Sequence, residues 1–446
     1  MNLEAKAPGA EALGSADLSA FAESLLAAAE RGRGPLRRVL LVPPDQTRLH
    51  SLAGPLTREF ARLLGPGRTT ILPATGTHRA MGGHEIGAMF GDLDPRLFRS
   101  HDHRRGNRRL GELPASLVEE LSGGRLSFSF PGDFDELLLE DWDLVLSIGQ
   151  VVPHEVVGMA NYTKNLVVGL GGAESISLSH WLGAVAGLES IMGRADTPVR
   201  RLLDASASRF LAGLPVVYAL TVLSRDGQGS LGLRGLFAGS GHGPGSGGEA
   251  AFLKAAELSA SLNVEALDEP VRTCVVRLDP SEYRSTWLGN KAVYRTRMAL
   301  ADGAELFVLA PGVERFGEDP AIDALIRRHG YRGTPATLSA VESDPALAGS
   351  LAAAAHLVHG SSEGRFRITY CTELLSRSEV EGVGYRWAPL GEVEERFGLA
   401  AASRGTAADG PRAAPARPRD GWNERGGERF FYVSNPALGL WRRAEA

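Results

Sequence analysis

Three side chains that can carry protons, bind a metal or form a covalent bond stand in one short stretch of the sequence: His154, Lys164 and His180. Histidine changes its charge near neutral pH and is a common metal ligand. Lysine has a primary amine that can lose its proton and bond covalently, unlike the guanidinium of arginine. The chain has 48 basic residues, and only four of them are lysine: Lys6, Lys164, Lys254 and Lys291. We therefore expect a lysine inside a motif to be there for its amine.

Polar motifs also follow three short apolar runs that are typical of buried strands. The motifs and the runs before them are DQTR (45–48) after 39–42, TGTHR (75–79) after 69–72, and GQVVPH (149–154) after 144–147. The carboxyl ends of parallel strands line one crevice, where ligands bind, so the three motifs are expected to converge. A Thr-Arg pair that enters a helix, as Thr47-Arg48 does, suits a phosphate or a carboxylate.

The elements that must position these motifs predict an α/β fold with mostly parallel sheets, because strands alternate with helices. The length favours two domains, which we place at residues 1–250 and 251–446, with the active site in the cleft between them. Residues 400–421, rich in Ala, Pro, Gly and Arg, are expected to be disordered. The expected strands are 39–42, 69–72, 144–147, 215–223, 273–277, 305–309, 367–371 and 429–433. The expected helices are 18–31, 51–64, 83–90, 178–188, 249–262, 291–301 and 320–329.

Composition excludes several classes of function. The net charge is −5, which gives no electrostatic case for binding nucleic acid. No apolar run is long enough to span a membrane, and the N-terminus does not resemble a signal peptide, so we expect a cytoplasmic protein without membrane contact. The two cysteines, Cys274 and Cys371, are far apart and predict neither a disulfide framework nor a thiolate metal site. Residues 243–248 match GxGxxG formally, but no strand leads into them, so we interpret them as a loop.

The central stretch resembles the nickel-dependent lactate racemase family. That family has a Pro-His pair, a lysine ten residues after this histidine and a second histidine sixteen residues after the lysine. His154, Lys164 and His180 reproduce this spacing. The DQTR and TGTHR motifs, together with His101-Asp102, are similar to the family's N-terminal domain. Residues 287–292 (WLGNKA) look like its substrate-binding lysine segment, so that the resemblance runs from about residue 38 to residue 372.

The resemblance implies a racemase or epimerase of a 2-hydroxy acid. Such an enzyme moves a hydride reversibly from the substrate α-carbon to a nickel-pincer nucleotide, which is pyridinium-3,5-bisthiocarboxylic acid mononucleotide. Lys164 would hold this cofactor covalently, and His180 would be the protein ligand to nickel. His101 and His154 would be the catalytic acid–base pair, with His103 as an alternative to His101.

Other residues are assigned by the same resemblance. Arg48 and Lys291 would bind the substrate carboxylate, and Asp45 and Thr47 would lie at the cofactor nucleotide. The implied partners are a small 2-hydroxy acid and the proteins that synthesise the cofactor.

The chain departs from the family at two places. Asn161 and Tyr162 replace glycines in the turn before the lysine, which predicts added bulk at the cofactor. Leu288 stands where the family has a substrate-binding glutamine, so we expect a 2-hydroxy acid other than lactate to be the substrate. Two alternatives from other classes are a non-catalytic carrier of the cofactor and a 2-hydroxy-acid oxidoreductase on the same scaffold. A conventional hydrolase on the same scaffold is a further alternative.

Overall fold

The computed structural model describes the whole chain except residues 10, 226–229, 400–417 and 445–446. The described residues form two compact units, Met1–Asn263 and Val264–Ala446. The boundary that we expected after residue 250 falls inside helix α9, which packs on the first unit's sheet as a whole.

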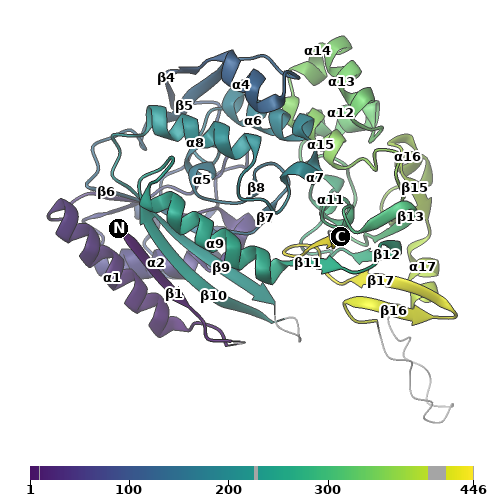
Figure 1. Ribbon diagram of the computed structural model, residues 1–446, viewed down its shortest axis with the longest axis horizontal. Helices are drawn as coiled ribbons and strands as arrows, with labels where there is room; N and C mark the ends of the chain where they lie inside the picture. The colour runs from purple at the N-terminus through teal and green to yellow at the C-terminus, as the bar shows by residue number, and fades with distance from the viewer. Residues whose placement is uncertain (10, 226–229, 400–417, 445–446) are drawn as a thin grey trace, which may run out of the picture. The chain divides into compact units, whose positions relative to one another are not determined.

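In the first unit (Figure 1), the strands are β1 Asn2–Lys6, β2 Val39–Val42, β3 Thr69–Ile71, β4 Asn107–Leu113, β5 Phe130–Asp135, β6 Leu144–Gln150, β7 Pro153–His154, β8 Gly158–Met159, β9 Val216–Arg225 and β10 Leu231–Ser240. The helices are α1 Ser15–Arg33, α2 Ala53–Leu64, α3 Gly83–Phe90, α4 Ala115–Ser122, α5 Thr163–Val167, α6 Ala173–Ala186, α7 Leu188–Ile191, α8 Pro198–Phe210 and α9 Gly247–Asn263, with the short 3-10 helices η1 Gln46–Ser51 and η2 Pro95–Leu97.

Six of these strands form one sheet in the order β1-β10-β9-β6-β2-β3. Strands β9, β6, β2 and β3 are parallel, so their carboxyl ends lie along one edge. Strands β10 and β1 extend the sheet on the other side in antiparallel register. The parallel half therefore brings the segments after β2, β3 and β6 together, as the sequence predicts.

Alternating side chains of the sheet enter two cores. Val39, Leu41 and Leu146 pack against α1, α2 and α3 on one face. Leu40, Val42 and Val145 face the opposite side, where α5, α6, α8 and α9 lie. Figure 1 shows α9 crossing β9 and β10 and α1 running beside β1, in agreement with the contacts between these elements.

The second unit has its own α/β sheet. Its strands are β11 Val264–Leu267, β12 Val271–Arg277, β13 Leu300–Leu309, β14 Arg367–Cys371, β15 Arg386–Ala388, β16 Gly421–Arg425, β17 Glu428–Val433 and β18 Leu440–Arg443. Its helices are α10 Thr286–Gly289, α11 Lys291–Thr296, α12 Pro320–His329, α13 Thr334–Ser343, α14 Pro345–Ala348, α15 Leu351–His359, α16 Arg377–Gly382 and α17 Leu390–Phe397.

Six strands of this unit pair in the order β15-β14-β13-β12-β17-β16, and only β16 is antiparallel to its neighbour. The expectation of an α/β fold with mostly parallel sheets is thus confirmed. The segment expected to be disordered lies outside the described residues up to residue 417, and its last residue, Gly421, begins β16.

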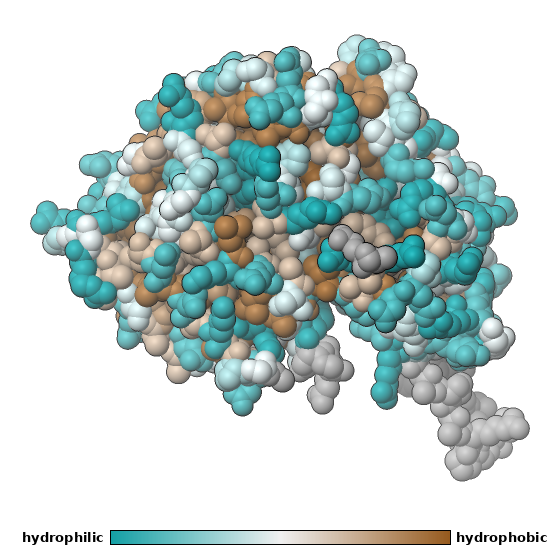
Figure 2. Space-filling model, in the orientation of Figure 1, coloured by the Kyte–Doolittle hydropathy of each residue, from teal (hydrophilic) through white to brown (hydrophobic). Residues whose placement is uncertain are grey.

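The surface carries hydrophilic residues over much of the face seen in Figure 2, with hydrophobic residues between them. Leu49 and Leu253 are among the large hydrophobic side chains that are exposed. Among the described residues, no helix has the length and apolar character needed to cross a membrane.

Candidate functional site

Asp45 starts the short helix that follows β2. It is buried, and its carboxylate accepts hydrogen bonds from the Thr47 backbone N–H (3.1 Å) and the Thr47 hydroxyl (2.6 Å). The same carboxylate lies 2.7 Å from Nδ1 of His78, which comes from the TGTHR segment after β3. Burial raises the pKa of Asp45, but the hydrogen bonds from His78 and Thr47 outweigh it and leave the pKa below its usual value.

This contact fixes the protonation pattern of His78. A carboxylate accepts only, so Nδ1 of His78 carries a proton and the neutral ring has its lone pair on Nε2. The His78 side chain is about half exposed, with 48% of its surface accessible. A partly exposed histidine that is oriented by a carboxylate is suited to accept a proton.

Lys164 lies in the first turn of α5 and is half-buried. Burial lowers the pKa of its amine to about 8, Arg48 adds to this shift, and Glu155 opposes it. The amine is therefore substantially neutral just above neutral pH, and only a neutral amine is a nucleophile.

His180 lies on α6, and a helix carbonyl sets its tautomer. Nδ1 is 2.7 Å from the carbonyl oxygen of Ile176, to which it donates. The neutral ring then has its lone pair on Nε2, as a metal-ligating histidine requires. Burial, reinforced by the charge of Lys164, lowers the pKa of His180 to about 4, so the ring is neutral at physiological pH.

His154 ends the short strand β7 and is buried. The backbone N–H of Val156 donates to its Nδ1 at 3.1 Å, so a neutral ring carries its proton on Nε2. Burial lowers the pKa of His154 well below its usual value, Glu155 opposes the shift, and Lys164, Arg48 and His180 add to it. The structure thus brings together six residues, which we call the Lys164 site: Asp45, Arg48, His78, His154, Lys164 and His180.

His101 has a different environment from the one that we expected. Its Nδ1 is 2.7 Å from the carboxylate of Asp135 and its Nε2 is 3.2 Å from the carbonyl oxygen of Gly171. The side chain has no accessible surface. His101 therefore connects β5 to the segment before α6. His78, in contrast, is among the charges that lower the pKa of His180, after burial and Lys164. The alternative, His103, is partly exposed, and His78 is among the charges that lower its pKa after burial and Arg104.

The remaining expected residues fall in both units. Arg48 and Thr47 lie in η1, with Arg48 half-buried and Thr47 exposed. Lys291 begins α11 of the second unit, and its amine lies over the ring of Tyr283, 5.6 Å from the ring centroid. Its proposed contact with the substrate stays a prediction.

The bulk of Tyr162 does not enter the Lys164 site, contrary to our expectation from the sequence. The side chain is fully buried and stacks on Phe252 with 5.1 Å between ring centroids. Its hydroxyl accepts a hydrogen bond from the backbone N–H of Gly243 at 3.0 Å. The side-chain oxygen of Asn161 accepts the backbone N–H of Tyr162 at 2.7 Å. The two larger residues keep the positive φ angles that glycine favours, 68° and 58°.

Several buried polar groups at the carboxyl ends of β2, β3 and β6 have no hydrogen-bond partner among the described residues. They are the side-chain oxygens of Gln46 and Thr75 and both amide atoms of Gln150. Buried polar groups are rarely left unpaired, so this edge of the sheet fits a polar ligand with several donors and acceptors. No cluster of three or more His, Cys, Asp or Glu side chains able to hold a metal occurs within the described part of the chain.

Comparisons with known proteins find similarity in sequence and in fold. Residues 27–192, which contain the whole Lys164 site, match the family described as the lactate racemase N-terminal domain. A solved structure of a protein from Thermotoga maritima matches with a TM-score of 0.76 and 24% identity, over 87% of this chain and 95% of that one. The lactate racemase apoprotein from Thermoanaerobacterium thermosaccharolyticum matches with a TM-score of 0.68 and 16% identity, over 97% of this chain and 94% of that one.

At these identities the two structures show a shared fold and nothing more. No curated protein matches the chain. Residues 27–192 are thus similar to the lactate racemase N-terminal domain, and the spacing of His154, Lys164 and His180 lies within this match.

Proposed function

We propose that this protein is a racemase or epimerase of a 2-hydroxy acid and that its nickel-pincer nucleotide is attached to Lys164. The observation that supports this best is the protonation of the Lys164 site. A lysine with a pKa of about 8 lies beside two histidines, His154 and His180, that burial keeps neutral. A neutral amine can form a covalent bond, and a neutral imidazole can bind a metal.

The residues present fit the cofactor. Lys164 would hold it through the amine, and His180 would bind nickel through Nε2, because Nδ1 is engaged with Ile176. The unpaired groups of Thr75 and Gln150 would hydrogen-bond the nucleotide. When bound, this group supplies an acceptor and donor of hydride for the substrate α-carbon.

The chain's own residues would handle the proton. Nε2 of His78, with Nδ1 held by Asp45, would accept the hydroxyl proton and return it. Nε2–H of His154 would hydrogen-bond the same oxygen, since its Nδ1 accepts from Val156. We therefore place the second acid–base residue at His78 instead of His101. Arg48 would bind the substrate carboxylate as a bidentate partner, together with Lys291.

The substrate would be a 2-hydroxy acid other than lactate. Leu288 has no polar side chain with which to replace the glutamine of the family. The altered turn at Asn161 and Tyr162 adds no argument about the substrate, since Tyr162 is buried in the core.

The test uses 2-hydroxy acids that carry deuterium on the α-carbon, incubated in ordinary water with protein made alongside the cofactor-synthesis proteins. We expect both stereoisomers to appear with the deuterium retained, because a hydride that never becomes a proton does not exchange with water. His78→Gln and His154→Gln should each abolish the reaction, while His329→Gln, a matched change at the end of α12, should not.

Loss of the deuterium to water would contradict the proposal. A protein that retains the cofactor but converts no 2-hydroxy acid in the panel would favour the carrier function instead. A net release of 2-oxo acid would favour the oxidoreductase.

A further inference from the structure

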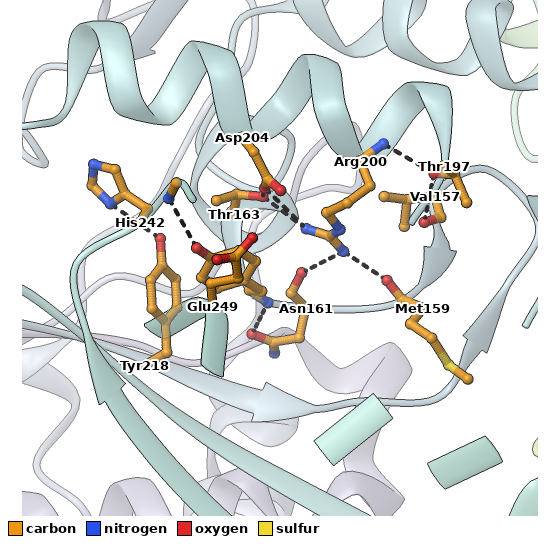
Figure 3. Close-up of polar contacts among 12 residues, drawn as sticks. Val157, Met159, Asn161, Thr163, Thr197, Arg200, Asp204, Tyr218, His242 and Glu249 are labelled. Atoms are coloured by element: carbon orange, nitrogen blue, oxygen red, sulfur yellow. Dashed lines mark hydrogen bonds and ion pairs between the residues drawn. The ribbon is translucent and has the colours of Figure 1, made fainter. Parts of the chain in front are cut away.

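Arg200 is a buried arginine that contacts the turn before Lys164. It comes from α8, which begins after Thr197 and Pro198. Its side chain donates to the carbonyl oxygens of Met159 (2.7 Å) and Asn161 (3.1 Å). It also donates to the hydroxyl of Thr163 at 2.7 Å. Figure 3 shows the guanidinium reaching from the helix to these three groups.

The turn that Arg200 contacts has an unusual backbone. Asn161 and Tyr162 both have positive φ angles, and Tyr162 combines φ 58° with ψ −133°. Residues other than glycine rarely adopt such angles, and they do so where the surrounding structure enforces them. Lys164 follows Tyr162 by two residues, so the direction of its side chain depends on this turn.

Two further contacts hold the turn and the guanidinium together. The guanidinium carbon lies 4.4 Å from the centroid of the Phe252 ring and 5.6 Å from that of Tyr162. The rings of Phe252 and Tyr162 are themselves stacked. The ring of Tyr162 and the guanidinium of Arg200 therefore pack in one cluster with Phe252.

Arg200 is incompletely neutralised. Asp204, one turn along α8, lies 3.9 Å from it, and the Thr163 hydroxyl donates to Asp204 at 2.5 Å. Burial raises the pKa of Asp204, which opposes its ionisation. Arg200 is among the charges that lower the pKa of Lys164, after burial and Arg48.

We propose that Arg200 is a positioning residue for Lys164: its guanidinium holds the Met159–Thr163 turn in the conformation that presents the amine to the site. It also places a fixed positive charge near that amine. The importance of this arrangement for catalysis rests on the proposed function, because it matters only if Lys164 reacts. The effect of Arg200 on the turn and on the amine does not depend on the cofactor, so it can be measured on the protein without it.

The experiment measures the reactivity of Lys164 directly. The full chain without cofactor is acylated with a trace of acetic anhydride at several pH values, and the rate at Lys164 is divided by that at exposed Lys254 in the same digest. Hydrogen exchange of a peptide that covers residues 158–168 gives the second readout. The variants are Arg200→Met and Arg200→Lys, with Arg201→Met on the exposed side of α8 as the matched control.

We expect Arg200→Met to lower the relative labelling of Lys164 at pH 8, because loss of the nearby positive charge raises the pKa of the amine. A rise of one unit in this pKa would lower the labelling about fivefold. Arg200→Lys should keep the pH midpoint of labelling, since the charge remains, but should speed hydrogen exchange in the turn, since lysine lacks the planar fork. Arg201→Met should change neither readout.

Unchanged hydrogen exchange of the turn in folded Arg200→Lys would overturn the proposal, even if Arg200→Met does not fold. Failure of the proposed function would look different. The wild-type chain would then acquire no cofactor on Lys164, while the effect of Arg200 on labelling and exchange would persist.

Discussion

Replacing Tyr162 by glycine, the residue expected there from the family, tests whether its ring belongs to the core or to the functional site. Truncating a buried aromatic side chain costs about 3–5 kcal/mol. The Gly243 N–H would lose its acceptor, which adds about 1 kcal/mol or more. Relief of the strained backbone angles returns about 1–3 kcal/mol. We therefore expect Tyr162→Gly to lower the free energy of unfolding of the first unit by about 3 kcal/mol.

The assay is a urea titration followed by pulsed hydrogen exchange, read on peptides from β9 and α9. This readout isolates the first unit, because two units need not unfold together. Asn161→Gly is the matched control, because it changes the same turn without removing a core ring and should alter stability by less than about 1 kcal/mol. A Tyr162→Gly variant as stable as the wild type would refute the assignment of the ring to the core.

Three further predictions follow from the same geometry. Acylation of the whole chain across a range of pH should show a midpoint near 8 for Lys164, because burial lowers its pKa; a midpoint at the ordinary value of 10.5 would contradict this. Asp45→Asn should reduce the difference between the free energies of unfolding at neutral and at acidic pH, measured by urea titration. The folded-state pKa of Asp45 is lowered, so ionised Asp45 stabilises the fold above its unfolded-state pKa and this contribution is lost as the pH falls through the folded-state pKa; an unchanged difference would oppose this. Gly169→Ala should cost about 1–3 kcal/mol in the same titration, because a methyl group would overlap the Asn165 carbonyl oxygen and lie 2.6 Å from Cβ of Ala74; Gly67→Ala, where no atom lies within 4 Å, should have little effect.

Much of the parallel framework could be predicted from the sequence because its signals are local. The strand Val39–Val42 and the helices Gly83–Phe90 and Pro320–His329 have the expected bounds. Each is a short apolar or periodic run bounded by glycine or proline. Asp45 and His154 could be expected to lie in the same region, because the carboxyl ends of parallel strands lie along one edge of the sheet.

The antiparallel strands could not be predicted in this way. Strand β1 (Asn2–Lys6) pairs with β10 (Leu231–Ser240), more than 200 residues away, and no local sequence pattern indicates this pairing. Strand β10 also contains three glycines, which weaken strand propensity. The helix expected at residues 291–301 ends at Thr296, since β13 begins at Leu300 and pairs with β12.

The environments of the two histidines could not be predicted for a similar reason. His101 stands next to an aspartate in the sequence, but its partners in the fold are Asp135 and Gly171. His78 bonds Asp45, which is 33 residues away. The sequence did contain a signal for the contact between His78 and Asp45, because the TGTHR and DQTR segments each follow a strand of the parallel sheet. Tyr162 was misjudged because the sequence alone does not show which way a side chain leaves a strained turn.

The most direct test of the central claim is the mass of the intact protein and of its Lys164 peptide after production with the cofactor-synthesis proteins. We predict an adduct of the nucleotide on Lys164, absent in Lys164→Arg and retained in Lys254→Arg. Nickel should accompany the adduct and be lost in His180→Gln. A catalytically active protein whose Lys164 carries no adduct would contradict the account.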